Sequence, residues 1–260
     1  METPKITPKQ LQILLHLYRF RFLNRHHIQS FLNHKDPKRI NEWLKDLTSK
    51  QIIGRIYSKK LGENIQPAIY YLSSKSHQIL KDRDDIDKRI LKRVYQERLR
   101  SRKLIDHHLL VADIHFFLQA QAKDNNQQLH FFTKTDLTKH TYLPFQRPDA
   151  YIALKANTDD TKRYFMEIIA PDTPRFAMRA KIGQWLEYAD GGKWQETTNH
   201  PFPTILLACP SEATKHYLYH HISQVLEQEM AEVDFYLTTD HSIEASKMKT
   251  NIWQRVVEAN

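Results

Sequence analysis

Residues 7–47 contain three segments of helical periodicity, and each follows a residue that commonly starts a helix. Thr7 precedes the first segment, Asn24 the second and Asp36 the third, with prolines directly after Thr7 and Asp36. The apolar residues of each segment recur at the spacing of one buried face: Leu11, Leu14, Leu15, Tyr18 and Phe22; Ile28, Phe31 and Leu32; Ile40, Trp43 or Leu44, and Leu47. The sequence therefore predicts three short helices, each with one buried face.

Two apolar strands, 52–57 and 68–72, follow these helices and flank a polar tip, which predicts a hairpin. Three helices and a hairpin are the element order of a winged helix-turn-helix, whose third helix can enter the major groove of DNA. We therefore predict DNA binding by polar residues of the third helix and of the hairpin tip, namely Lys38, Arg39, Asn41, Lys45, Lys59 and Lys60. The alternative is a small helical bundle or protein-interaction module in which these lysines are merely solvated.

Charge is divided unevenly along the chain. Residues 1–105 carry 24 Lys and Arg against 10 Asp and Glu, whereas residues 106–260 carry 15 against 20. A basic half of this kind favours double-stranded DNA as the partner, because Lys and Arg that neutralise phosphates supply most of the non-specific affinity. A homodimer is expected because a single winged helix contacts few base pairs. A scaffold without DNA affinity would require this charge to be incidental.

The remaining pattern indicates a winged helix over 1–75, a basic helical linker over 76–103 and an α/β domain over 104–260, α+β overall. The linker either follows DNA phosphates or bridges the domains in solvent. Parallel pairing is expected where a helix separates two strands, with 204–209 central. The predicted strands of the last domain are 129–132, 150–154, 164–169, 204–209 and 234–238, and the predicted helices are 104–122, 174–188, 212–229 and 243–257.

Composition excludes several classes of protein. No stretch approaches the roughly 18 to 20 apolar residues of a membrane span, and Met1–Gln10 lacks the apolar core of a signal peptide, so no membrane partner is expected. Cys209 is a single cysteine, which cannot form an internal disulfide and is typical of a reducing compartment such as the cytoplasm. The five glycines form no nucleotide-binding loop.

One pair of acids has the pattern of metal chemistry. Asp149, within Arg147-Pro148-Asp149, opens one predicted strand, and Glu167 lies in the next. Metal-dependent nucleases hold Mg²⁺ with two carboxylates and place a lysine nearby, in the motif PD, a spacer, then (D/E)xK. Asp149 and Glu167 match the two acids, whereas Ile169 occupies the lysine position. Lys181 on the following helix, or Lys155, is the available substitute.

The order of these features resembles the replication-relaxation family of plasmid and mobile-element proteins, from about Thr7 to Ile222. The matching phrases are residues 14–23, His107-His108, 147–150, 165–168, 179–182 and Tyr188. The resemblance implies a DNA-binding winged helix joined to a PD-(D/E)xK nuclease-like domain, and a role in plasmid replication, DNA relaxation or mobile-element control. It places Asp149, Glu167 and Lys181 at the family's site positions. The sequence departs after Glu167, where Asp172 is a candidate displaced acid.

Two hypotheses follow for the second half. In the first, the nuclease-like domain does not cleave DNA and serves dimerisation or docking of a replication or mobilisation protein, and DNA binding needs no cofactor. In the second, the chain is a Mg²⁺-dependent endonuclease or nickase, with Asp149 and Glu167 as metal ligands and Lys181 as the charge stabiliser. A zinc site at His216 and His220 has weaker support, because no glutamate follows His216.

Overall fold

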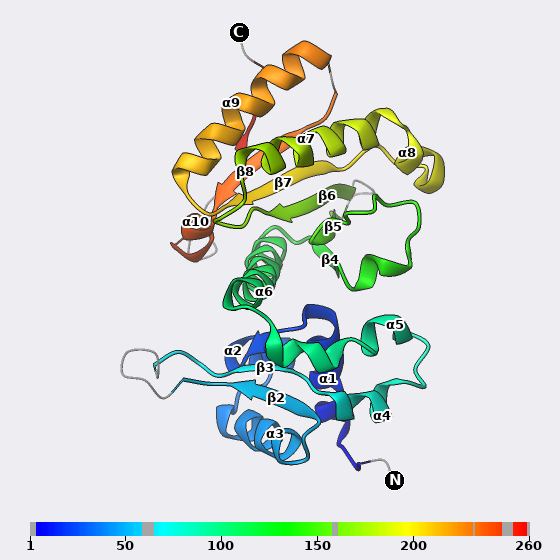
Figure 1. Cartoon of the computed structure of the whole chain (residues 1–260), viewed down its shortest axis with the longest axis vertical. Coiled ribbons are helices and arrows are strands. Elements are labelled where there is room, and N and C mark those ends of the chain that lie inside the picture. The colour runs from blue at the N-terminus through cyan, green and yellow to red at the C-terminus, as the bar shows by residue number, and fades with distance from the viewer. Residues whose placement is uncertain (1–3, 59–64, 158–160, 231, 246–251, 259–260) are drawn as a thin grey trace. The chain divides into compact units, whose positions relative to one another are not determined.

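The computed structural model describes residues 4–58, 65–157, 161–230, 232–245 and 252–258. The chain divides into two compact units, Met1–Ala112 and Asp113–Asn260, which we call unit 1 and unit 2. Within the described ranges, unit 1 holds a three-stranded sheet in the order β1-β3-β2, and unit 2 a six-stranded sheet in the order β4-β5-β6-β7-β8-β9 (Figure 1). The predicted mixed α/β class is confirmed. None of the described helices combines the length and apolar composition that crossing a bilayer needs.

Unit 1 begins with three helices at the predicted places: α1 (Pro8–Phe20), α2 (Arg25–Phe31) and α3 (Pro37–Ser49). The side chains of Thr7, Asn24 and Asp36 each accept a hydrogen bond from a first-turn backbone N–H, which satisfies donors that a helix start otherwise leaves open. The buried stripe of α1 is centred on Ile13 and Leu17, so the predicted Leu11 and Leu15 are only half-buried. In α3 the buried residues are Ile40, Leu44 and Leu47.

The sheet of unit 1 joins β1 (Leu23–Asn24) to the hairpin of β2 (Ile53–Ile56) and β3 (Ile69–Leu72), with antiparallel pairing throughout. Phe22, Ile69 and Ile105 form a small core that includes the start of α6 (Arg102–Asp124). Gly54 pairs with Tyr71, whose ring lies over the glycine backbone. The predicted hairpin is confirmed, and the Tyr71 ring fits over position 54 because glycine has no side chain.

Replacement of Gly54 by alanine is expected to destabilise unit 1. The added methyl would overlap the Tyr71 ring, and moving that ring costs about 1 to 3 kcal/mol of unfolding free energy. Urea unfolding checks this, with Gly183→Ala as the matched control. Gly183 lies exposed inside α7 (Arg175–Asp190), and apart from the adjoining helix backbone no heavy atom lies within 4 Å of the place that an alanine methyl would take there. This change should therefore stabilise by roughly 1 kcal/mol. Equal stability of Gly54→Ala and the natural chain would contradict the expectation.

Residues 76–103, expected as a linker, instead pack into unit 1 as short turns. These are η1 (Ser74–Ser76), α4 (His77–Leu80), α5 (Lys88–Leu91) and η2 (Val94–Leu99). Leu80, Ile86, Leu91 and Val94 are buried at isolated positions along the segment. The dense charge of the segment hides these anchors in the sequence, because they form no continuous helical stripe. The expected boundary at residue 75 therefore falls inside unit 1.

Two polar contacts strengthen this packing. The backbone N–H of Asp87 donates to the Tyr18 hydroxyl at 2.8 Å. The guanidinium of Arg21 contacts both carboxylate oxygens of buried Glu97, with Nη2–Oε1 at 2.9 Å. Arg21 ends α1 with a φ of 67°, a left-handed conformation that is uncommon for a residue with a side chain. These contacts hold residues 76–99 against α1 within unit 1.

Unit 2 contains a mixed sheet, and two helical connections between its parallel strands cover one face of it. β4 (Gln128–Thr133), β5 (Ala150–Lys155) and β6 (Thr161–Ile168) pair antiparallel, after which β7 (Thr204–Cys209) and β8 (Phe235–Thr239) run parallel to β6. The crossovers contain α7 with α8 (Lys193–Thr198), and α9 (Glu212–Glu229). The predicted parallel pairing holds for β6 with β7 and for β7 with β8, each pair being separated by a long helix, and 204–209 is central as predicted. It fails for β8 and β9, which pair antiparallel although α10 (Asp240–Ala245) lies between them. A short helical turn, η3 (Asp136–Lys139), follows β4.

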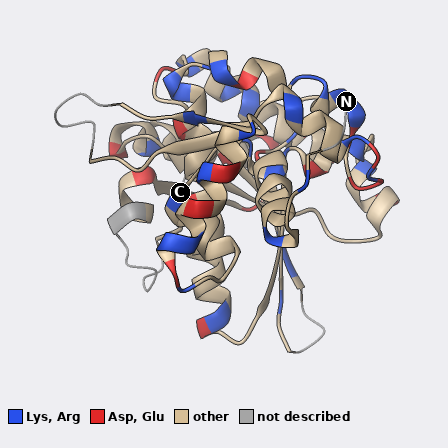
Figure 2. Cartoon of the chain, turned by 90° about the horizontal axis from the view of Figure 1, so that it is seen from below, with Lys and Arg blue, Asp and Glu red and all other residues tan. Residues whose placement is uncertain are grey.

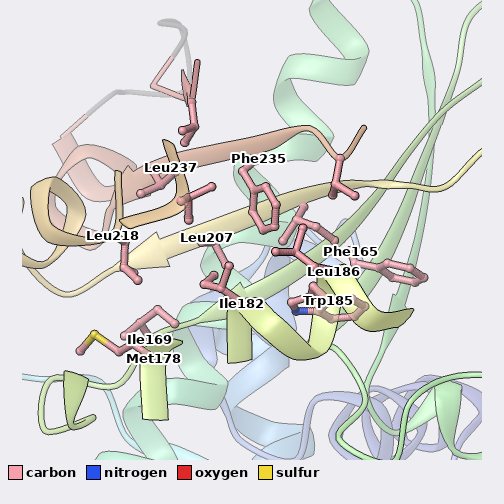
Figure 3. Close-up of a cluster of buried hydrophobic side chains, with 14 of the residues drawn as sticks. Phe165, Ile169, Met178, Ile182, Trp185, Leu186, Leu207, Leu218, Phe235 and Leu237 are labelled. Carbon is pink, nitrogen blue, oxygen red and sulfur yellow. The ribbon is translucent and has the colours of Figure 1, made fainter. Parts of the chain in front are cut away.

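One face of this sheet packs against α7 and α9. Phe165 and Ile169 contribute to the core from the sheet, Met178 and Ile182 from α7, and Leu218 from α9 (Figure 3). The alternation of β6 places Glu167 on the same face as Phe165 and Ile169. A carboxylate therefore lies under α7, within an otherwise apolar layer.

The predicted last helix, 243–257, is helical at 243–245 and wrong over 252–257, and residues 246–251 lie outside the described residues. α10 (Asp240–Ala245) is followed by β9 (Gln254–Arg255), which pairs antiparallel with β8. The backbone N–H of Val256 donates to the Phe235 carbonyl at 2.9 Å. A short apolar run fits a helix or a strand equally well, and the open edge of β8 decides the outcome here.

Candidate functional site

The four side chains predicted on the third helix are all exposed on α3: Lys38, Arg39, Asn41 and Lys45. The opposite face carries Ile40, Leu44 and Leu47, and each of these is at most 1% exposed. The core of unit 1 thus fixes one face of α3 and leaves the polar face accessible. Lysine and arginine positions are marked in blue in Figure 2.

Arg39 is held by its neighbours on α3. Its Nη1 donates to Glu42 Oε2 at 2.8 Å, and its Cζ lies 5.6 Å from the centre of the Trp43 ring. The Arg39 and Glu42 side chains are 56% and 63% exposed, so the ion pair contributes little and exchanges readily for another acceptor. Within the described ranges, the side chains of Lys38, Asn41 and Lys45 have no protein partner.

The predicted tip residues Lys59 and Lys60 lie outside the described residues. The strand that leads to the tip contributes an arginine that sequence analysis missed. Arg55 is exposed, pairs across the hairpin with Tyr70, and its Cζ lies 4.8 Å from the centre of the Tyr57 ring. Burial raises the pKa of Tyr70, and the charges of Arg55 and Arg25 oppose that rise. Because side chains alternate along β2, Arg55 lies on the same face of the strand as Ile53.

The candidate acids lie in a row across three strands of unit 2. The register pairs Thr133 with Ala150 and Ala150 with Met166, so the next residues, Lys134, Asp149 and Glu167, are opposite one another. The Lys134 N–H donates to the Asp149 carbonyl, and the Asp149 N–H to the Met166 carbonyl, both at 2.9 Å. Lys134 Nζ lies 3.8 Å from Asp149 Oδ1, while Asp149 Oδ2 accepts the Ile168 N–H at 2.9 Å.

Lys181 joins this row from α7, a helix that covers this face of the sheet. Its Nζ donates to Glu167 Oε2 at 2.5 Å. The structure thus brings together the three residues that sequence analysis selected, Asp149, Glu167 and Lys181. It adds Lys134, which was missed because it belongs to no part of the nuclease motif. Lys134 could be found only by knowing that β4 pairs with β5 in this register, which places it opposite Asp149.

Burial dominates the electrostatics of the two acids. Glu167 is 1% exposed and Asp149 5%. Burial raises the pKa of Glu167 to about 7, with Lys181 lowering it and Asp149 raising it further. Burial lowers the pKa of Lys181, but the carboxylates of Glu167 and Asp149 outweigh this and leave it above its usual value. Near neutral pH, Lys181 is therefore charged and Glu167 is protonated for part of the time.

The Glu167 carboxyl group is expected to titrate near pH 7 in ¹³C NMR spectra of the full chain. Removal of the Asp149 charge in Asp149→Asn should lower this pKa, and removal of the Lys181 charge in Lys181→Met should raise it, because the first charge disfavours and the second favours ionisation. A Glu167 pKa near 4.5 in the natural chain would refute the burial argument.

The same shift predicts a pH dependence of stability. A glutamate whose pKa is higher in the folded chain than in the unfolded chain binds its proton more tightly when folded, so the free energy of unfolding falls as pH rises. For Glu167 this fall should begin near pH 4.5 and be complete above about pH 7. Glu167→Gln should remove this component from urea unfolding measured across that range.

Protein groups contact the carboxylate oxygens of both acids in this arrangement. Lys181 occupies an oxygen of Glu167, and the Ile168 N–H and Lys134 face the two oxygens of Asp149. No group of three or more His, Cys, Asp or Glu side chains among the described residues is placed to hold a metal ion. A metal ion would have to displace lysine ammonium groups that already balance the acids.

The other residues considered lie away from this row. Lys155 is at the far end of β5, about 20 Å along the strand from Asp149. Asp172 is exposed in the loop after β6, and Ile169 is 2% exposed beside Met178 and Ile182 (Figure 3). Ile169 therefore fills core space and leaves no charged group at the usual lysine position.

Two further features, the histidine pair of the zinc hypothesis and the single cysteine, show no sign of a site within the described ranges. The rings of His216 and His220 stack with their centres 6.1 Å apart on the exposed side of α9. They belong to no metal-binding group within the described ranges. Burial, with the Asp240 charge, raises the pKa of the Cys209 thiol to about 12. This thiol is therefore not a nucleophile at neutral pH.

Similarity to known proteins identifies the family of this chain. Among solved structures, the chain is similar to restriction endonuclease FokI, with a TM-score of 0.34 and 10% sequence identity over 90% of this chain and 43% of that one. A similarity this weak carries no argument about function. A search of curated proteins finds no match. A family model described as replication-relaxation matches residues 14–204, a range that includes α3, Asp149, Glu167 and Lys181. Because this match spans well over half of the 260 residues, the chain belongs to the replication-relaxation family.

Proposed function

We propose that the chain is a double-stranded DNA-binding protein of a plasmid or other mobile element, acting in the cytoplasm in replication, relaxation or transcriptional control. The observation that carries this proposal is the exposed polar face of α3, backed by the buried Ile40, Leu44 and Leu47. In a winged helix this helix enters the major groove. Membership of the replication-relaxation family supports a replication-related role.

The polar face of α3 offers both kinds of DNA contact. Arg39 and Asn41 match the hydrogen-bonding edges of guanine and adenine, and Lys38 and Lys45 suit phosphates. Lys59 and Lys60 at the hairpin tip, with Arg55 at its base, would extend the phosphate contacts. A homodimer would double the contacted site and so its specificity.

In this proposal unit 2 is a nuclease-like domain that does not cleave DNA, and it serves dimerisation or the docking of a replication or mobilisation protein. The pairing of Glu167 with Lys181 supports this, since an occupied carboxylate is a poor metal ligand. The second candidate function is a Mg²⁺-dependent endonuclease or nickase. The convergence of Asp149, Glu167 and Lys181 favours it.

Alanine substitutions on α3 test the DNA-binding proposal. Arg39→Ala or Asn41→Ala should cost about 1 to 3 kcal/mol at a site selected from random duplexes, and little on unselected DNA. Fluorescence anisotropy with both duplexes measures the difference. Arg89→Ala is the matched control, because Arg89 is also exposed and paired with a neighbouring acid, Asp87. Parallel loss on both duplexes in Arg39→Ala would assign Arg39 to phosphate contact, and no loss in either α3 variant would contradict the proposal.

A further inference from the structure

Two arginines of α7 converge on one tyrosine of α9 at the surface of unit 2. The Arg175 Cζ lies 4.7 Å from the centre of the Tyr217 ring, and Arg179 Nη1 donates to the Tyr217 hydroxyl at 3.3 Å. Arg175 and Arg179 are both exposed, and they share a helix face because they are four residues apart. Tyr217 therefore holds two guanidinium groups close together.

These arginines differ from the others in unit 2. Arg147 donates to backbone carbonyls, Arg163 donates to the Thr161 carbonyl, and Arg255 pairs with Asp234 at 2.7 Å. In the part of the chain that the structure describes, neither Arg175 nor Arg179 pairs with a carboxylate or donates to a backbone carbonyl. Acids outnumber bases in residues 106–260, so a lack of acids in the sequence does not explain this.

The surroundings of Tyr217 favour an external anion. Two guanidinium groups that share one partner repel each other, and an anion between them removes that cost. The His221 ring lies parallel to the Tyr217 ring, with centres 6.5 Å apart. Burial and then the Arg179 charge lower the pKa of His221, so this imidazole reports on charge at the cluster.

We propose that Arg175, Arg179 and Tyr217 form a binding site for a phosphate group. The planar fork of each guanidinium matches two phosphate oxygens, which makes arginine pairs suited to this ligand. α7 begins after the carboxyl end of β6, and α9 begins after the carboxyl end of β7. The site therefore lies at the same end of these parallel strands as Asp149 and Glu167. The phosphate belongs either to a DNA strand or to a free phosphate ester. The DNA source rests on the proposed function.

Titration of the full chain with inorganic phosphate, at constant ionic strength set with chloride, tests the site directly. The NMR signals of the Arg175 and Arg179 side-chain N–H groups should shift and saturate, and the pKa of His221 should rise as the anion offsets the Arg179 charge. The Arg175→Gln, Arg179→Gln double variant should lose the His221 response. Arg255→Gln, a matched exposed arginine, should retain it. A shift that grows linearly without saturation, or that is equal at Arg255, would overturn the proposal.

Duplex DNA identifies the source of the phosphate. If the site takes a DNA phosphate, the double variant should reduce the slope of log affinity against log salt by about one to two, whereas Arg255→Gln should not. An unchanged slope with saturable inorganic phosphate binding would assign the site to a free phosphate ester. Failure of DNA binding by α3 leaves the phosphate titration unaffected, so the two proposals fail separately. Arg179→Lys, which keeps the charge but loses the fork, should bind phosphate more weakly than the natural chain.

Discussion

A chain in which Lys38, Arg39 and Lys45 are replaced together by glutamate is expected to bind duplex DNA at least about a hundredfold more weakly at physiological salt. All three side chains lie on the exposed face of α3, so the change reverses the charge that faces DNA while the buried Ile40, Leu44 and Leu47 keep the helix in place. The natural chain should itself lose several hundredfold in affinity between 50 and 200 mM salt if about five cations contact phosphates. Fluorescence anisotropy at both salt concentrations measures these effects.

A triple variant of equal charge separates local contact from overall attraction. Lys9, Lys75 and Lys81 are exposed in unit 1 but lie outside α3 and the hairpin, and glutamate at all three changes the net charge by the same amount. Its affinity for duplex should fall far less than that of the α3 variant. Equal loss in the two triple variants would show that unit 1 binds through its total charge and would remove the special role of α3.

Supercoiled plasmid incubated with the purified chain and Mg²⁺ or Mn²⁺ is expected to remain uncut. Lys181 donates to Glu167, which is protonated for part of the time near pH 7, and Asp149 already accepts a backbone N–H. Cleavage also needs a group that stabilises charge on the phosphate, and Ile169 at the usual lysine position is buried against α7. The expected rate is therefore that of a preparation without the carboxylates.

Three variants serve as references for this cleavage assay. Asp149→Ala and Glu167→Ala remove the acids that any metal would need, so they define contamination by other nucleases. Lys181→Ala removes the lysine that would stabilise the phosphate. Metal-dependent nicking by the natural chain that disappears in all three would establish the endonuclease and overturn the binding-only proposal for unit 2.

Local rules were enough for much of the fold. Thr7, Asn24 and Asp36 start their helices as predicted, because the side chain that caps a helix acts within one turn. The parallel pairing of β6, β7 and β8 follows similarly, since parallel neighbours need a long crossover and α7 and α9 supply it. Asp149 and Glu167 were found through the PD-(D/E)xK motif, and Lys181 as a substitute lysine that the family resemblance also places, rather than through any local rule.

The remaining features depend on partners distant in sequence. Lys134 joins the acids only through the pairing of β4 with β5, and no pattern around residue 134 reveals that register. The strand at Gln254–Arg255 requires the free edge of β8. Leu80, Ile86 and Leu91 are single apolar residues within a charged segment, and their burial depends on the surface that unit 1 offers them.

The buried anchors of residues 76–99 set the length of the smallest piece of unit 1 that keeps its packing. A polypeptide truncated after Lys75 would leave the Arg21 guanidinium without Glu97 and would uncover the apolar surface beneath Leu80 and Leu91, a surface prone to aggregation. A polypeptide that continues to Ala112 keeps all of these groups. Any transfer of unit 1 into another protein would therefore have to carry the whole of residues 1–112 rather than α3 and its hairpin alone.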